Sequence, residues 1–261
     1  MEENISSDIT INHHLSVPYT LNEVSGIVTV GNFIIAHNDG DDGPNIYILD
    51  KTDPSEYRKI RVKGSKNKDW EDIASDEQYI YIADVGNNNK RRKAFQIYMI
   101  SIEELLKSDK ETQPFHIIDF EYEKKKSPNC EAITIFNDKI YLFTKEKNES
   151  RVYTLNREEP WQVAEDKGQF KLKGEITGAT GINNSYFMLT GYRKLSETAY
   201  RPFLMKVVPN ERRAKHWEST KYKFPKSGQM EGITPLSEKQ FLVSTERAGF
   251  SPARFYNITF Q

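Results

Sequence analysis

The sequence repeats one short pattern five times at similar intervals, and this repetition strongly limits the folds that the chain can adopt. Each copy has a small or acidic residue, a second residue of any type, and then an isoleucine. The copies begin at Ser25, Glu71, Glu131, Thr180 and Glu231, so consecutive copies lie 46, 60, 49 and 51 residues apart. The remaining stretch, from Glu231 round to Ser25 through both termini, is 55 residues long. A closed ring of five similar units is therefore predicted.

Each copy continues with segments of alternating apolar and polar residues, the pattern of strands with one solvated face. The predicted second strands are 33–37, 79–83, 140–144, 186–190 and 241–245, and the third strands are 46–49, 95–100, 152–155, 202–208 and 254–260. Fourth strands follow in four copies, at 57–63, 115–123, 169–173 and 217–224. The last copy lacks one, and segment 8–17 can supply it.

The sequence thus predicts a single all-β domain over residues 1–261, a five-bladed β-propeller with four antiparallel strands per blade. The N-terminal strand 8–17 completes the last blade and closes the ring. A six-bladed ring is the main alternative, but it needs a sixth copy that the sequence lacks. The longest interval has a local cause, because Ser101-Ile-Glu-Glu104 forms a capping box that predicts a short helix to about Ser108.

Composition excludes several classes of protein. Lys and Arg total 37 and Asp and Glu total 38, so the net charge of −1 argues against a nucleic-acid binder. The longest apolar runs are far shorter than the about 20 residues that a membrane-spanning helix needs. Cys130 is the single cysteine, which excludes an intramolecular disulfide and any multi-cysteine metal site. The first residues have no basic and apolar leader pattern, so no signal peptide is expected in this sequence.

The first residues of the five copies should point into one axial channel, because the innermost strand of every blade lines it. All five carry oxygen, and three are carboxylates, which resist ionisation when clustered and buried. A shared cation would relieve this. Oxygen ligands without cysteine or histidine favour Ca²⁺ or Mg²⁺ over zinc or copper, and the flexible geometry of Ca²⁺ suits such a ring better than the rigid octahedron of Mg²⁺. Alternatively, these side chains cap strand ends and bond to neighbouring backbone amides. The predicted metal ligands are Ser25, Glu71, Glu131, Thr180 and Glu231.

The loops after the second strands should crowd the same end of the channel. In one interpretation Lys145, Arg193 and Arg247 hold an anionic group while an acid activates water. In the other, the acids and bases pair with one another and the Asp, Asn and Gly residues shape turns. The candidate catalytic residues are Asp39, Asp84, Lys145, Arg193 and Glu246, and the candidate ligand-binding residues are His37, Asn38, Asn87, Asn88, Tyr192 and Arg247.

Two resemblances extend these predictions. The order Ser25, Glu71, Glu131, Thr180, Glu231 resembles the ligand ring of the calcium-activated nucleotidases (apyrases), which implies an axial calcium held by these five residues and nucleotide hydrolysis. The longer motifs Asp69-Trp-Glu-Asp-Ile-Ala74 and Asp84-Val-Gly-Asn-Asn88 resemble a group of secreted or lipid-anchored bacterial propellers. That second resemblance implies the fold and an exported protein: secreted, periplasmic or lipid-anchored at the cell surface.

Two functions remain open from the sequence. The first is a calcium-binding propeller whose polar pocket hydrolyses a phosphorylated small molecule such as a nucleotide. The second is a non-catalytic propeller that binds a carbohydrate, peptide or protein partner on the same face. In both, a small anionic or polar ligand lies at the channel mouth, with no nucleic acid and no membrane span.

Overall fold

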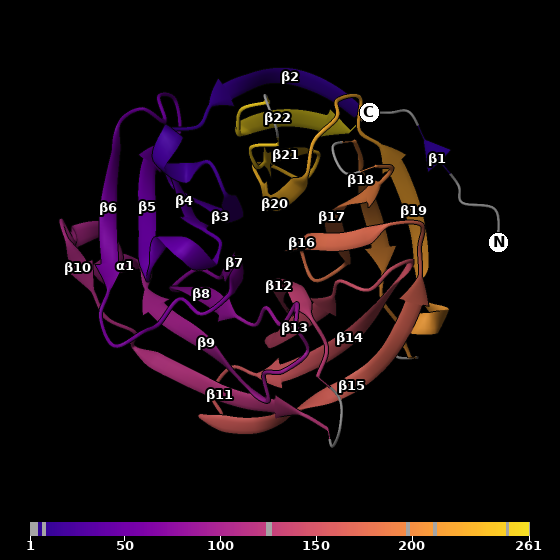
Figure 1. The fold of residues 1–261 in the computed structure, drawn as a ribbon, viewed down its shortest axis with the longest axis horizontal. Coiled ribbons are helices and arrows are strands. Elements are labelled where there is room, and N and C mark those ends of the chain that lie inside the picture. Colours follow the sequence, from indigo (N-terminus) through magenta and orange to yellow (C-terminus); the bar gives the residue numbers. More distant parts are fainter. Residues whose placement is uncertain are drawn as a thin grey trace.

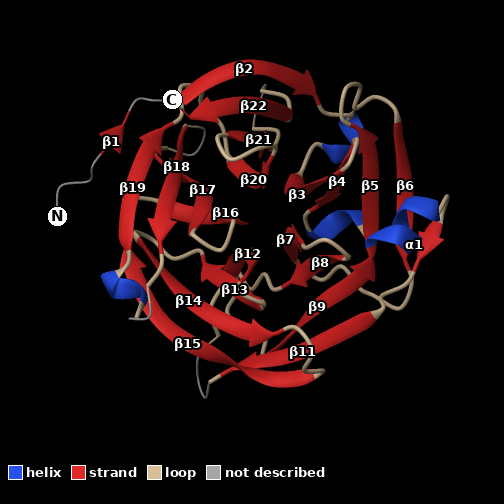
Figure 2. Ribbon diagram, turned by 180° about the vertical axis from the view of Figure 1, so that it is seen from behind, coloured by secondary structure: helices blue, strands red, loops and turns tan. Residues whose placement is uncertain are grey.

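The computed structural model describes residues 5–6, 9–123, 127–196, 199–210, 213–248 and 251–260. Its strands form a ring around a central axis, as Figure 1 shows. The described part of the chain holds one α-helix, α1 (Ile102–Lys107), at the outer rim (Figure 2), and three short 3-10 turns. Those turns are η1 (Tyr19–Leu21), η2 (Gly40–Asp42) and η3 (Ala214–His216). None of the described helices is long and apolar enough to cross a membrane.

The strands are arranged in layers from the axis outwards (Figure 1). The innermost strands are β3 (Val24–Val30), β7 (Trp70–Ser75), β12 (Cys130–Phe136), β16 (Glu175–Ile182) and β20 (Met230–Pro235). The second strands are β4 (Phe33–Asn38), β8 (Tyr79–Asp84), β13 (Lys139–Thr144), β17 (Tyr186–Lys194) and β21 (Gln240–Thr245). Each innermost strand pairs antiparallel with the second strand that follows it.

The third and the outer strands complete the layers. The third strands are β5 (Asn45–Asp50), β9 (Ala94–Ser101), β14 (Glu149–Asn156), β18 (Tyr200–Val208) and β22 (Arg254–Phe260). The outer strands are β6 (Tyr57–Val62), β11 (His116–Tyr122), β15 (Trp161–Lys171), β19 (Glu218–Lys223) and β2 (Ile9–Ser16). Two short strands, β1 (Ile5–Ser6) and β10 (Glu111–Thr112), extend the edges of β19 and β6.

These strands form four hydrogen-bonded sheets within the described residues, and not five separate ones. The reason is a parallel pairing between the outer strands β11 and β15, which joins two four-strand units into one eight-stranded sheet. Strand β15 also begins at Trp161, earlier than the predicted outer strand 169–173, and this extension supplies the residues that pair with β11.

The two ends of the chain close the ring, as predicted. Strand β2 lies outside β22 and pairs antiparallel with it, with Ile11 opposite Ile258 (Figure 1). Asp8, at the start of the predicted closing strand, lies outside the described residues. The predicted short helix is also confirmed, because the Ser101 side chain accepts a hydrogen bond from the Glu104 backbone and caps α1.

Apolar side chains fill the spaces between neighbouring units. Trp70, for example, is fully buried in a cluster with residues of β3, β5, β8 and β9. Because each unit buries its faces against its neighbours, the innermost strands are held at fixed positions around the axis. This packing determines where the polar groups at the channel mouth can lie.

Candidate metal and ligand site at the channel mouth

Each innermost strand has an irregularity of register near its start. The pairing shifts between Val24 and Ile27, Trp70 and Asp72, Cys130 and Ala132, Ile176 and Gly178, and Met230 and Ile233. A bulge of this kind redirects a side chain without ending the strand. The residues within these irregularities include Ser25, Glu71, Glu131, Thr177 and Glu231.

The fourth of these residues is Thr177, whereas the sequence predicted Thr180. The segment Ile176-Thr-Gly-Ala-Thr-Gly-Ile182 contains Thr-Gly twice, and the isoleucine of the repeat follows only the second copy. In the structure Thr180 is half-buried and lies beyond the bulge, opposite Met188. The Thr177 hydroxyl donates to the Met230 carbonyl, just as the Ser25 hydroxyl donates to the Glu71 carbonyl. Both hydroxyls therefore connect neighbouring innermost strands.

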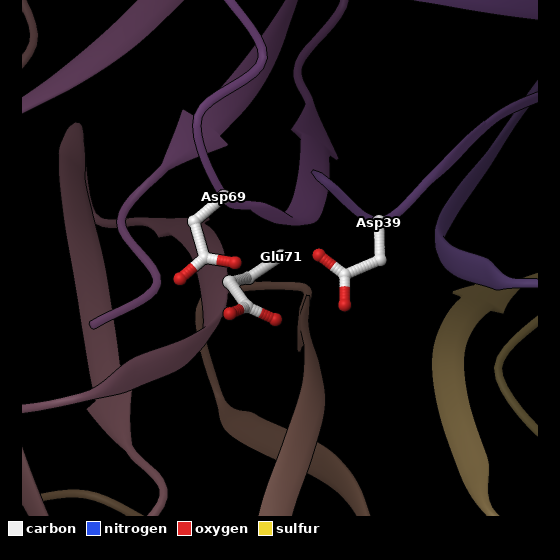
Figure 3. Close-up of side chains that lie close together, drawn as sticks. All are labelled: Asp39, Asp69 and Glu71. Atoms are coloured by element: carbon white, nitrogen blue, oxygen red, sulfur yellow. The ribbon is translucent and has the colours of Figure 1, made fainter. Parts of the chain in front are cut away.

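Three carboxylates meet at one side of the mouth (Figure 3). Asp39 follows β4, Asp69 precedes β7, and Glu71 lies in the bulge of β7. One oxygen from each lies within 4.8 Å of one from each of the others. Sequence reasoning predicted Glu71 as a ligand and Asp39 as a catalytic acid, but it missed Asp69, which stands just outside the repeated triplet. Its presence in the Asp69–Ala74 motif was the available signal.

The backbone at Gly86 closes the side of this acidic cluster. A Cβ atom placed on Gly86 would overlap Glu71 Oε1 and the carboxyl group of Asp69. Only glycine therefore lets the chain pass so close to the two acids. The loop that carries it is held by Arg92, which donates to the Gly86 carbonyl at 2.9 Å.

Burial and mutual repulsion oppose ionisation of this cluster. Burial raises the pKa of Glu71 well above its usual range, and the charges of Glu131, Asp39 and Asp69 add to the effect. Burial also raises the pKa of Asp69 to about 6, again with help from Asp39 and Glu131. Glu71 Oε1 is buried and has no hydrogen-bond partner among the described residues. The cluster thus offers several oxygens and too little positive charge.

A second group of acids, which includes Glu131 on the neighbouring strand β12, contains its own cation. Lys145 Nζ lies 2.8 Å from Glu131 Oε2, and Asn129 donates to the other oxygen of Glu131 at 2.6 Å. The lysine also lies over the ring of Tyr192, 5.5 Å from its centroid. Burial raises the pKa of Glu231, whereas the charge of Lys145 acts in the opposite direction. Lys145 therefore balances Glu131 and Glu231.

Asp84, a predicted catalytic acid, is fully buried and bound within the protein. Its Oδ1 lies 2.8 Å from Arg92 Nη1 and accepts a hydrogen bond from the Asp69 amide at 3.1 Å. Burial raises the pKa of Asp84, and Arg92 counteracts the rise. These contacts make Asp84 a support for the Asp69 and Gly86 backbone.

Four predicted ligand-binding residues make contacts within the protein, although His37 Nε2 and Asn38 Oδ1 are buried without a hydrogen-bond partner among the described residues. His37 is fully buried against the edge of Trp70, and this burial lowers its pKa. Asn38 donates to the Thr20 carbonyl at 2.7 Å. The buried Asn87 connects loops by donating to the Ser127 hydroxyl at 2.7 Å and by accepting from the Arg92 amide. The exposed Asn88 accepts a hydrogen bond from Asn129.

The three predicted cations lie in different environments. Lys145 is paired with Glu131, and Arg193 and Arg247 are both exposed. Strand β17 continues to Lys194, beyond the predicted end at 190, so Arg193 lies within the sheet. Neighbouring side chains of a strand point to opposite faces, so Arg193 points away from the face that Tyr192 uses to contact Lys145.

A pocket of about 300 Å³ opens beside the acidic cluster. Its described lining is almost entirely charged, with Glu23, Asp39, Gly40, Lys68, Asp69 and Glu246. Burial raises the pKa of Glu246 to about 7, opposed by Lys145 and assisted by the charges of Asp39 and Glu23. The pocket therefore suits a polar ligand and has an acid that titrates near neutrality.

Comparison with known proteins identifies the fold. The structure is similar to an exo-β-1,3-galactanase from Phanerochaete chrysosporium (TM-score 0.56, 10% identity, covering 96% of this chain and 64% of that one). It is also similar to the allergen Mala s 1 of Malassezia sympodialis (TM-score 0.55, 9% identity, 95% and 96% covered). A PQQ-bound aldose sugar dehydrogenase from Streptomyces coelicolor gives a TM-score of 0.52 at 10% identity, with 97% and 98% covered.

These likenesses show a β-propeller-type fold and nothing about the reaction, because a fold of this kind hosts many activities. No protein family matches the sequence, and no curated protein matches it.

Proposed function

We propose that this protein is a β-propeller that binds a divalent cation, Ca²⁺ by preference, between Asp39, Asp69 and Glu71. The observation that carries the proposal is the buried Glu71 Oε1, which has no partner within a cluster of three converging carboxylates. Oxygen ligands without histidine or cysteine favour Ca²⁺ or Mg²⁺, and an irregular set that water must complete favours Ca²⁺. The proposed ligand set differs from the predicted five-residue ring, since Ser25 donates to a backbone carbonyl, Glu131 is paired with Lys145, and Thr180 lies beyond the bulge of β16.

The architecture that supports this site is best described as five blades. We count the eight-stranded sheet as two four-stranded blades whose outer strands β11 and β15 happen to pair in parallel. All 261 residues then belong to one propeller domain, with β2 completing the last blade. Export to the cell exterior or envelope remains part of the proposal and rests on the motif resemblance alone.

The cation would also organise a ligand site, because the charged pocket adjoins the cluster and shares Asp39 and Asp69 with it. A calcium ion held by only three side chains has coordination positions left for ligand oxygens. Sugar hydroxyls and phosphate oxygens both fit this chemistry. The galactanase and the sugar dehydrogenase among the similar structures make a carbohydrate a reasonable first probe.

Hydrolysis of a phosphorylated small molecule is the second candidate function. The observation in its favour is Glu246, whose pKa of about 7 suits a general acid or base at neutral pH. Lys68 lines the same pocket and supplies a positive charge. Release of phosphate from a nucleoside diphosphate, with Ca²⁺ and with chelator, measures this activity. A Glu246→Gln variant should lose it, and absence of turnover in the folded protein would leave the binding function.

The metal proposal is tested by calorimetric titration of the chelator-treated protein with Ca²⁺. Glu71→Gln and Asp69→Asn should each weaken Ca²⁺ binding at least tenfold, the lower end of the effect expected for disturbing a metal site. Glu121→Gln removes an exposed carboxylate on β11 and is the matched control. The proposal fails if the wild-type protein takes up no Ca²⁺, or if the control loses as much affinity as the two site variants.

A further inference from the structure

Arg193 lies in a second pocket, which the sequence did not predict. This pocket has a volume of about 320 Å³ and lies over β17, β18 and β19. Five cationic residues line it, and none of its described lining residues is acidic. They are Lys173, Arg193, Arg201, Lys221 and Lys223.

The strand register places these cations together on one face. Arg193 of β17 lies directly opposite Arg201 of β18, and Lys223 of β19 lies directly opposite Phe203 of β18. Because side chains alternate along a strand, Arg201 and Phe203 share a face, and so do the residues opposite them. The two arginines are thus cross-strand neighbours.

The cross-strand pairing of Arg193 with Arg201 is unfavourable for the protein alone. Like charges directly opposite each other on a sheet are destabilising. Lys221 is fixed nearby, since its ammonium group donates to the Lys173 carbonyl and lies 3.8 Å from the centroid of the Phe203 ring. The fold therefore gathers positive charge around a concave surface in a chain whose net charge is only −1.

We propose that this pocket binds a small molecule that carries two or more phosphate or carboxylate groups. Two adjacent guanidinium groups can each hold an oxyanion with two parallel hydrogen bonds, and the lysines add positive charge. The volume suits a small ligand, and the overall charge lacks the basic excess of a nucleic-acid binder. The site is separate from the proposed calcium site and needs no metal.

Calorimetric titration with pyrophosphate and with citrate, in chelator and at low salt, tests this proposal. The wild-type protein should bind at least one of the two probes, and the double variant Arg193→Gln/Arg201→Gln should lose about a hundredfold in affinity, roughly tenfold per charged hydrogen-bonding group. Arg91→Gln/Lys93→Gln removes the same charge from two exposed residues on another loop and should bind as the wild type does.

Three results would overturn the proposal: no binding of either probe, an equal loss in the control variant, or tighter binding of a single-stranded oligonucleotide than of both probes. Because chelator is present throughout, none of these outcomes bears on the calcium site. A second measurement addresses the repulsion itself. Arg201→Gln alone should raise the melting temperature of the ligand-free protein, and a lower melting temperature would contradict the charge conflict.

Discussion

The two sides of the channel mouth carry similar acids but different counter-charges. On one side, Lys145 pairs directly with Glu131, and its charge also interacts with that of Glu231. On the other, Lys145 and Arg92 oppose the rise in the pKa of Glu71 and of Asp69, respectively, but each acts less strongly than the charges of Asp39 and Glu131. A buried carboxylate cluster needs positive charge nearby. The fold supplies a lysine on the first side, and the lack of a matching cation among the described residues on the second is the basis for the proposal that a cation from solution binds there.

The largest effect is expected from removing the internal cation. Lys145→Met should lower the free energy of unfolding by about 3 kcal/mol, because the buried Glu131 and Glu231 then lose the positive charge that balances them. Denaturant titration of the metal-free protein measures this change. Lys147→Met, at an exposed position two residues away, should have little effect. Equal stability of the two variants would contradict this account, since Lys145 would then not balance Glu131 and Glu231.

The next largest effect is expected at Gly86, whose backbone lies beside the cluster of Asp39, Asp69 and Glu71. Gly86→Ala should cost about 2 kcal/mol and weaken Ca²⁺ binding, because the new methyl group overlaps Glu71 and Asp69. Gly40→Ala is the control, since a Cβ there would lie 3.5 Å from its nearest neighbour, an ordinary contact. If Gly86→Ala binds Ca²⁺ normally, the cation does not lie within this cluster.

The cluster of Asp39, Asp69 and Glu71 should also make the free energy of unfolding depend on pH. Asp69 has a pKa of about 6 when folded, above its ordinary value of 3.8, so the unfolded chain loses this proton first as pH rises. The contribution of Asp69 is therefore fully present below about pH 4 and is lost as pH rises through 6. In chelator, the wild type should lose about 2 kcal/mol more than Asp69→Asn between pH 4 and 7.

Saturating Ca²⁺ should remove most of this pH dependence at neutral pH, because the bound cation favours the ionised carboxylates. Denaturant titrations at both pH values, with and without Ca²⁺, provide the measurement. If the pH profiles of the wild type and of Asp69→Asn are parallel, the folded structure does not raise the pKa of Asp69.

A smaller effect distinguishes the two threonines of β16. Thr177→Val should cost about 1 kcal/mol, because it removes the hydrogen bond to the Met230 carbonyl and leaves that acceptor buried. Thr180→Val should change the free energy of unfolding by less than about half of that, as at other partly exposed positions. Thermal denaturation of the two variants compares them directly, and a larger loss in Thr180→Val would reject the register described here.

The repeated triplets predicted the innermost strands because packing against two neighbours imposes the same residue pattern on each of them. Glu71, Glu131 and Glu231 were identified in this way, and so was the closing strand. The same reasoning chose Thr180 for the fourth position, since Thr-Gly occurs twice and the isoleucine of the repeat follows only the second copy, whereas the strand pairing places Thr177 in the bulge.

The misplaced and missed site residues have physical causes too. Arg193 was assigned to a loop, but β17 continues past it by pairing with β18. Asp69 was missed because it belongs to one copy only, whereas the sequence argument relied on features that recur in all five. Pairing between distant segments and features of a single blade are both invisible to a repeat pattern.

The most direct test of the proposed cation site is a crystal structure of the protein soaked with Ca²⁺, together with an anomalous difference map. The account predicts one peak with carboxylate oxygens of Asp39, Asp69 and Glu71 at about 2.3–2.6 Å, and none beside Lys145. A peak beside Glu131 and Glu231 would contradict the account. So would a peak found only at a crystal contact, with none at Asp39, Asp69 and Glu71.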